Sequence, residues 1–156
     1  MEKSKDKMQK VDSQDYGESQ NTPYCITRRY GLSFDESVKN LKNGLEKLGF
    51  DIVAEFDVQH YLSSKIEKMP KHLILMVCEK ETASKLITND IQMGILFPCN
   101  VSIKEVEDNS VVEIAVEDTD ITWSASMKSE IQDIAKNTKA ILKKVFDMID
   151  QTHFKL

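Results

Sequence analysis

Residues 33–58 constrain the fold most, because a capped amphipathic helix there leads directly into an alternating strand. Ser33 and Glu36 form a capping box at the start of the helix, and Gly49 supplies a left-handed stop at its end. Apolar residues between them recur at steps of three and four, at Phe34, Val38, Leu41, Leu45 and Leu48. From Phe50 to Val58, apolar residues alternate with acidic ones, which predicts a strand with one wet face.

The remaining periodic segments complete a β-α-β-α-β-α-β-β-α order. They predict strands over 24–30, 72–78, 99–103 and 112–116, and helices over 58–68, 81–89 and about 129–152. The continuous apolar run at 72–78 is typical of a central strand covered on both faces. Residues 107–110 have turn chemistry, so the last two strands should form a hairpin. We therefore predict an α+β sandwich with one mixed sheet and helices packed mainly on one face.

Length and charge limit the classes of protein to consider. A chain of 156 residues predicts one domain, which we place at residues 23–156, after a disordered polar tail at residues 1–22. The formal net charge of −5 argues against nucleic-acid binding and against docking on anionic membranes. The apolar runs are too short to cross a bilayer, and the charged N-terminus does not resemble a secretory signal. We therefore expect a soluble cytoplasmic protein.

Cysteine and histidine positions argue against a metal site. The three cysteines (Cys25, Cys78 and Cys99) are widely spaced, and an odd number of them indicates reduced thiols. The three histidines (His60, His72 and His153) have no recognised ligand spacing. We accordingly expect no metal and no cofactor.

The corner Pro98-Cys99-Asn100 is the first candidate site, because a lone thiol stands there where an apolar run gives way to a strand. Cys99 could be a nucleophile or redox thiol, but the nearest basic residue in sequence is Lys104, so a small buried hydrophobe is the alternative. Cys78 could approach Cys99 if their strands are neighbours, and a thiol pair would support redox or sulfur-carrier chemistry. The alternative is two separate core thiols.

The candidates for binding a ligand at this corner are Cys99 itself and three further residues, Phe97, Asn100 and Trp123. Asn100 could donate hydrogen bonds to an oxyanion, or close a turn through its own backbone. Trp123, the single tryptophan, could cap a pocket or a dimer contact, or cover the edge of the core. An apolar pocket or patch is expected near Leu96, Phe97 and Trp123.

With these elements in place, the chain resembles the domain of unknown function family 302. The resemblance rests on four stretches, at residues 32–38, 49–59, the apolar strand ending at Cys78 with the helix containing Ala83, and 95–101 (Ile-Leu-Phe-Pro-Cys-Asn-Val). It implies a compact α+β fold and homodimers, and it implies no defined reaction.

These observations lead to two hypotheses of different classes. The first is a homodimeric ligand-binding or regulatory module that takes a small apolar ligand, because the sequence offers no set of nucleophile, base and orienting group. The alternative is a thiol redox or sulfur-carrier enzyme that uses Cys99 with Cys78.

Overall fold

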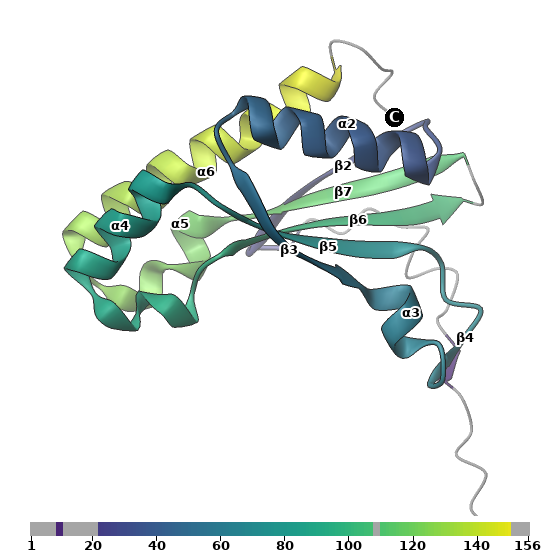
Figure 1. Ribbon diagram of the computed structural model, residues 1–156, viewed down its shortest axis with the longest axis horizontal. Coiled ribbons are helices and arrows are strands. Elements are labelled where there is room, and N and C mark those ends of the chain that lie inside the picture. Colours follow the sequence, from purple (N-terminus) through teal and green to yellow (C-terminus); the bar gives the residue numbers. More distant parts are fainter. Residues whose placement is uncertain (1–8, 11–21, 108–109, 151–156) are drawn as a thin grey trace, which may run out of the picture.

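The computed structural model describes residues 9–10, 22–107 and 110–150. Helices cover one face of a five-stranded sheet (Figure 1). The elements are β1 (Gln9–Lys10), β2 (Cys25–Tyr30), α2 (Phe34–Lys47), β3 (Asp51–Asp57), α3 (Val58–Leu62), β4 (Ile66–Glu67), β5 (His72–Cys78), α4 (Lys80–Asn89), η1 (Ile91–Ile95), β6 (Cys99–Glu107), β7 (Val111–Glu117), α5 (Thr119–Thr122), η2 (Ser124–Ser126) and α6 (Ser129–Asp150). Most of the predicted tail, the centre of the predicted 107–110 turn and His153 lie outside the described residues.

The sheet has the order β2-β7-β6-β5-β3, and every neighbouring pair of strands is antiparallel. The α+β class, the single helical face and the β6–β7 hairpin are confirmed. The antiparallel sheet differs from the mixed sheet that the sequence predicts. The physical reason is that β2 and β3, which α2 connects, occupy opposite edges, so the crossover never makes them neighbours.

The local signals around α2 act as predicted. The Ser33 side chain accepts a hydrogen bond from the Glu36 N–H at 3.4 Å, and Gly49 has φ +90°. Leu41 and Leu45 are fully buried against the sheet. A Cβ atom at Gly44 would lie 3.0 Å from Val145 Cγ2 of α6, so this glycine allows α2 and α6 to approach closely.

Among the described residues, helices cover only one face of the sheet (Figure 1). In β5, Leu75 and Val77 are fully buried in the core, whereas Ile74 and Met76 face the other way and line a cavity. The prediction that this strand is covered on both faces is therefore wrong. Its run is apolar on both sides because the second apolar face forms a cavity wall, and not because helices pack there. We call the uncovered side the open face.

The segment predicted as a helix over 58–68 is shorter than expected. Helix α3 ends at Leu62, and Ile66–Glu67 pair in parallel with Gln9–Lys10 as β4 and β1. That pairing requires extended backbone, which a helix cannot supply. Within the described residues, no helix is both long enough and apolar enough to cross a membrane.

Candidate functional site

Strand register arranges the open face as rows of side chains across the sheet. The first row contains Cys25, Glu117, Asn100, Met76 and Ala54. The second contains Thr27, Ala115, Ser102, Ile74 and Phe56. The third contains Arg29, Glu113, Lys104 and His72. Because side chains alternate between the faces of a strand, all of them lie on the side away from α2 and α6.

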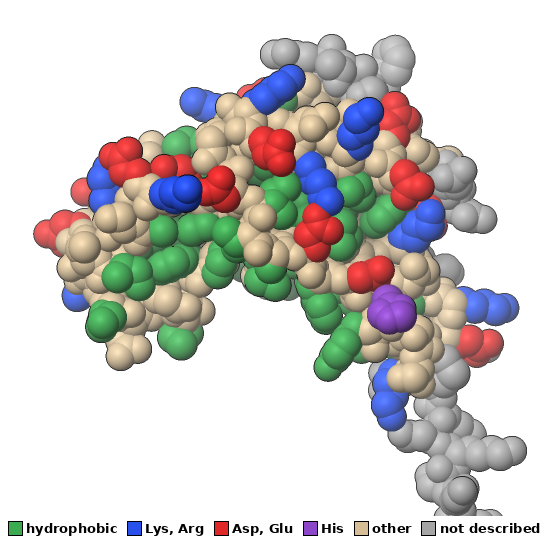
Figure 2. All heavy atoms as spheres, viewed as in Figure 1, with side chains coloured by type: hydrophobic (Ala, Val, Ile, Leu, Met, Phe, Trp, Pro, Cys, Tyr) green, Lys and Arg blue, Asp and Glu red, His purple; other side chains and the backbone are tan. Residues whose placement is uncertain are grey.

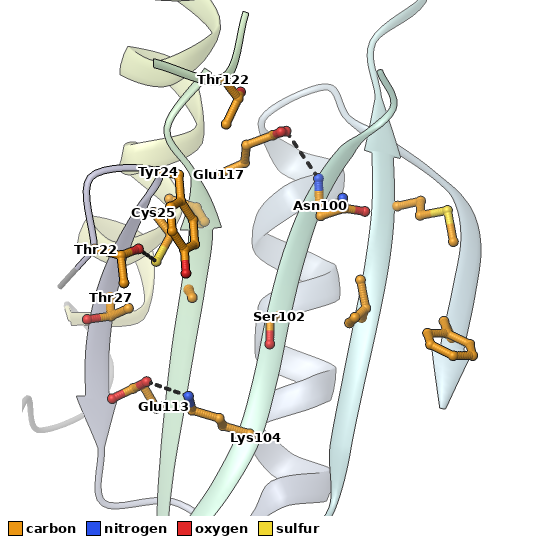
Figure 3. Close-up of a pocket in the computed structure, with 15 residues that line it drawn as sticks. Thr22, Tyr24, Cys25, Thr27, Asn100, Ser102, Lys104, Glu113, Glu117 and Thr122 are labelled. Atoms are coloured by element: carbon orange, nitrogen blue, oxygen red, sulfur yellow. Dashed lines mark hydrogen bonds and ion pairs between the residues drawn. The ribbon is translucent and has the colours of Figure 1, made fainter. Parts of the chain in front are cut away.

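A cavity of about 500 Å³ lies over the first two rows (Figure 3). Its walls differ across the sheet, with Ile74, Met76 and Phe56 from β5 and β3 on one side. Polar groups from β6 and β7 face them, and Tyr24 and Thr22 border the β2 edge. The surface beneath the sheet is correspondingly hollowed (Figure 2). A cavity of this size, apolar with a few polar groups, matches the usual character of small-molecule sites.

Glu117 supplies a carboxylate at one end of the cavity. It accepts a long hydrogen bond of 3.4 Å from the backbone N–H of Asn100 (Figure 3). Burial raises the pKa of Glu117, and the neighbouring Thr122 hydroxyl, Asn100 N–H and Cys99 thiol lower it only in part. Within the described part of the chain, no basic side chain forms an ion pair with Glu117. Among the described residues, the cavity therefore contains a carboxylate without a basic partner.

The opposite end of the cavity carries paired charges. Glu113, only 1% exposed, accepts from Arg29 Nε and from Lys104 Nζ, each at 3.0 Å. His72 Nε2 lies 2.9 Å from Ser102 Oγ. Burial, with the nearby positive charge of Lys104, lowers the pKa of His72 to about 4, so this imidazole is neutral at pH 7. These charges are satisfied within the protein.

Cys99 lies on the covered face of the sheet. It is 4% exposed and belongs to the hydrophobic core. Burial raises its pKa well above the ordinary range, and the charge of Glu117 and a hydrogen bond with it raise it further. Since the thiolate is the nucleophile, this environment opposes reactivity.

Cys78 and Cys99 are near each other along the sheet but lie on different faces. β5 and β6 are neighbours, and Cys99 pairs with Val77, the residue before Cys78. Alternation then directs Cys78 away from the core to which Val77 and Cys99 belong. Both thiols are free, and burial raises the pKa of Cys78 as well. The geometry does not support the thiol-pair alternative.

The predicted ligand-binding residues are only partly brought together. Asn100 lines the cavity. Trp123 is 1% exposed in the core, where its Nε1–H donates to the Leu96 carbonyl at 3.0 Å. Phe97 packs, half-buried, against the same core. Leu96, Phe97 and Trp123 do not line this cavity, which lies on the other face of the sheet.

Sequence reasoning missed Glu117, Cys25 and the apolar wall of the cavity. The signal was present in the alternation of β6, where polar Asn100, Ser102 and Lys104 separate buried Val101 and Ile103. That pattern indicates one face left without helices. Only the strand order then shows that Ile74, Met76 and Phe56 extend the same face with apolar groups.

Metal binding finds no support in the described ranges, where no three His, Cys, Asp or Glu side chains are placed to hold an ion.

Arg28 and Arg29 lie on opposite faces of β2, as alternation predicts, with Arg28 directed to α6 and Arg29 to Glu113.

Comparison with known proteins agrees with this architecture. The crystal structure of an uncharacterized conserved DUF302 protein from Bacillus stearothermophilus is similar, with a TM-score of 0.73 and 19% sequence identity. The match covers 81% of this chain and 98% of that one. At this identity the likeness establishes the fold alone. Comparison with curated proteins gives no match. A family model described as "Domain of unknown function DUF302" matches residues 25–149, and the chain therefore belongs to this family.

Proposed function

We propose that the domain is a ligand-binding module that holds a small amphipathic molecule in the open-face cavity. The single observation that carries the proposal is a cavity of about 500 Å³ with an apolar wall on one side and hydrogen-bonding groups on the other. An uncovered sheet face of this kind would expose Ile74, Met76 and Phe56 to water unless something covers them. Burying such side chains against a ligand is favourable, by roughly 25 cal/mol per Å² of apolar surface.

Binding accounts for the site better than catalysis does. The most nucleophilic residue type that the sequence offers at the Pro98 corner, Cys99, is buried with a raised pKa. The imidazole on the open face, His72, is neutral and bonded to Ser102 at the end where the charges are already paired. The cavity is lined by apolar side chains together with polar and charged groups such as Asn100, Ser102 and Glu117, and this mixture is suited to holding an amphipathic molecule.

Methyl NMR tests the proposal directly. With ¹³C-methyl-methionine labelling, short amphipathic probes such as 1-hexanol should shift the Met76 signal. The signal of Met93, which is 1% exposed in the core, should stay in place as an internal reference.

A paired set of variants then locates the binding site. Ala115→Phe fills the cavity from β7 and should abolish the Met76 shift. Ala140→Phe makes the same change on an exposed position of α6 and should leave the shift intact. Equal shifts in both variants, or no shift with any amphipathic probe, would contradict the proposed function.

A second candidate property, homodimerisation, is favoured by a separate apolar surface at the α4 end of the molecule (Figure 2). Five large, exposed apolar side chains occur on the segments there: Ile87, Ile91, Ile95, Ile121 and Met127. These segments are held together by Trp123 bonding to Leu96 and by Lys128 Nζ donating to the Asn89 carbonyl at 2.8 Å. We name these five residues the α4-end patch.

We propose a second copy of the chain as the partner for the α4-end patch, because the patch is flanked by both signs of charge. Asp90 and Lys128 border it, with Oδ2 and Nζ 4.0 Å apart. In an isologous contact every pair of residues meets twice, so Asp90 of each copy can pair with Lys128 of the other.

Sedimentation velocity measures the oligomeric state. Ile95→Asp, at a position 84% exposed, should shift a dimer to monomer without loss of fold. Val53→Asp changes a position 54% exposed on β3 and should leave the dimer intact. A wild-type monomer at all concentrations would refute this part of the proposal.

A further inference from the structure

The ligand class follows from how the carboxylates near the cavity are neutralised. On β7, Glu113 has two basic partners, Arg29 and Lys104. Directly after β7, Asp118 has Lys139, with Nζ and Oδ2 2.8 Å apart. Glu117 lies between these two acids and has no such partner within the described ranges.

The groups that do reach Glu117 are neutral. The Asn100 N–H is 3.4 Å away, at the long limit for a hydrogen bond. The Thr122 hydroxyl oxygen is buried and has no hydrogen-bond partner of good geometry in the described structure, although its nearness lowers the pKa of Glu117. The Cys99 thiol also hydrogen-bonds to Glu117, and a thiol is a weak donor. A half-buried carboxylate with only these weak neutral donors is incompletely satisfied, and a positive charge would compensate it best.

The apolar wall sets the rest of the ligand. Met76 lies in the same row as Glu117, two strands away. Because neighbouring strands are about 4.8 Å apart, roughly 10 Å separates Glu117 from the apolar wall at Met76. Ile74 and Phe56 continue that wall in the next row. A molecule with a charged end at Glu117 and a body the length of a hexyl chain would span this distance.

A ligand of the opposite charge does not fit as well. An anion placed near Glu117 would be repelled by the carboxylate. An anion at the other end would have to compete with Glu113 for Lys104, and that ion pair is already formed at 3.0 Å. The two ends of the cavity therefore favour a cation over an anion.

We propose that the open-face cavity binds an organic amine in its protonated form, with the ammonium group at Glu117 and the apolar body against Met76, Ile74 and Phe56. This inference rests on the proposed function, since it names the class of ligand for the same cavity. Binding of the ammonium requires ionised Glu117. Because Glu117 has a raised pKa in the empty site, amine affinity should increase as pH rises through that pKa.

Three probes of equal length test the charge of the ligand separately from binding in the cavity. Hexylammonium, 1-hexanol and hexanoate are titrated at pH 8, and the Met76 methyl signal reports occupancy of the cavity. Hexylammonium should bind about tenfold more tightly than 1-hexanol, as expected for one partly desolvated ion pair, and hexanoate should bind most weakly.

Glu117→Gln keeps the shape of the side chain and removes its charge. This variant should bind hexylammonium no more tightly than 1-hexanol, with 1-hexanol affinity unchanged from wild type. The control Glu46→Gln removes an exposed charge from α2, on the covered side of the sheet, and should keep the tenfold preference.

The outcomes distinguish the amine assignment from the existence of the binding cavity. Equal wild-type affinities for hexylammonium and 1-hexanol, or a preference that survives in Glu117→Gln, would overturn the amine assignment while leaving the binding cavity in place. Absence of any Met76 shift with all three probes would overturn both. An amine affinity that does not change between pH 4 and pH 8 would also refute the role given to Glu117, because its pKa is raised from the ordinary value of 4.5.

Discussion

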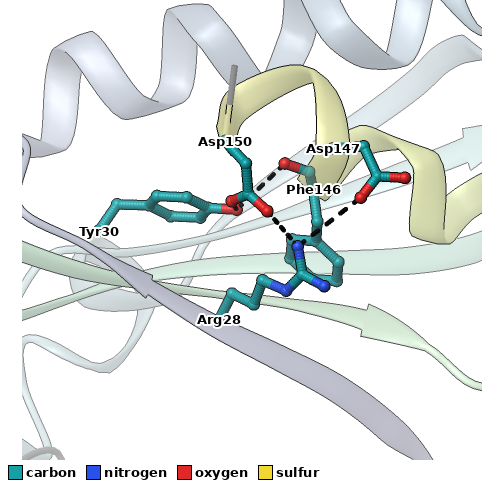
Figure 4. Close-up of polar contacts among 5 residues, drawn as sticks. All are labelled: Arg28, Tyr30, Phe146, Asp147 and Asp150. Atoms are coloured by element: carbon teal, nitrogen blue, oxygen red, sulfur yellow. Dashed lines mark hydrogen bonds and ion pairs between the residues drawn. The ribbon is translucent and has the colours of Figure 1, made fainter. Parts of the chain in front are cut away.

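Tyr30→Phe tests how β2 is attached to α6. The ring is fully buried, and its hydroxyl donates to Asp150 Oδ1 at 2.9 Å and approaches the Phe146 carbonyl oxygen at 3.5 Å (Figure 4). Arg28 pairs with the same carboxylate and lies over the Phe146 ring, 5.1 Å from its centroid. The substitution removes one oxygen and leaves the ring in the core, so it isolates the hydrogen bond to Asp150.

The expected loss is about 1.5 kcal/mol of unfolding free energy. Hydrogen bonds to charged groups contribute about 1.5–3 kcal/mol. The lower end applies, because Asp150 keeps its pair with Arg28 and its side chain is 27% exposed, so water can replace the hydroxyl. For a domain of this length, such a change lowers Tm by about 3–6 °C.

The pH dependence of stability provides an independent signature of the same contact. Burial and the hydrogen bond to Asp150 raise the pKa of Tyr30 well above its ordinary value of 10.0. The unfolded chain therefore ionises this tyrosine first, and stability falls as pH rises above about 10 by up to about 1.4 kcal/mol per pH unit. Tyr30→Phe should lack this contribution to the alkaline loss.

Urea unfolding followed by the fluorescence of Trp123, the single tryptophan and a core residue, measures both effects. Tyr61→Phe removes a hydroxyl from a side chain that is 69% exposed and should change stability by less than about 0.5 kcal/mol. A loss below about 0.5 kcal/mol in Tyr30→Phe, or an alkaline profile identical to wild type, would refute the reasoning.

Three further outcomes follow from the structure. The unfolding free energy of the wild-type protein should fall by no more than about 3 kcal/mol as pH falls from about 6.5 towards about 4, because His72 takes up a proton more readily in the unfolded chain than in the folded one. His72→Gln should reduce this loss, as measured by urea titrations at each pH. Iodoacetamide at pH 8, followed by peptide mass spectrometry, should modify half-buried Cys25 well before buried Cys99, and fast native-state labelling of Cys99 would contradict its placement. Trp123→Phe should lower the unfolding free energy by about 1–3 kcal/mol, since it leaves the Leu96 carbonyl without the indole N–H as its donor. An unchanged melting curve by circular dichroism would show that water replaces the indole N–H.

Local patterns predicted individual elements well. Ser33, Glu36 and Gly49 set the ends of α2, and the alternation of β6 and β7 predicted their hairpin. These signals act within one segment, through backbone conformation and the spacing of side chains, so the sequence alone is enough to recognise them.

The candidate site was harder to predict because it depends on how strands are ordered. The Pro98 corner attracted attention through its residue types, yet its thiol lies in the core. In the sequence, Glu117 is one of three closely spaced acids, with Asp118 and Asp120. What sets Glu117 apart is that Asn100 lies beside it and that it has no basic partner in the described structure, whereas Glu113 and Asp118 each have one.

The sequence by itself determined the α+β class, the bounds of the principal helix and the opposite directions of Arg28 and Arg29 on β2. Periodicity and capping are local properties, and they do not depend on which element lies alongside. Only the tertiary structure decided that β5 has one open face, that Cys78 and Cys99 point apart, and that Glu117 lies at a cavity where no described residue supplies a basic partner. Burial and charge pairing are set by neighbours distant in the chain, which a periodic pattern within one segment does not specify.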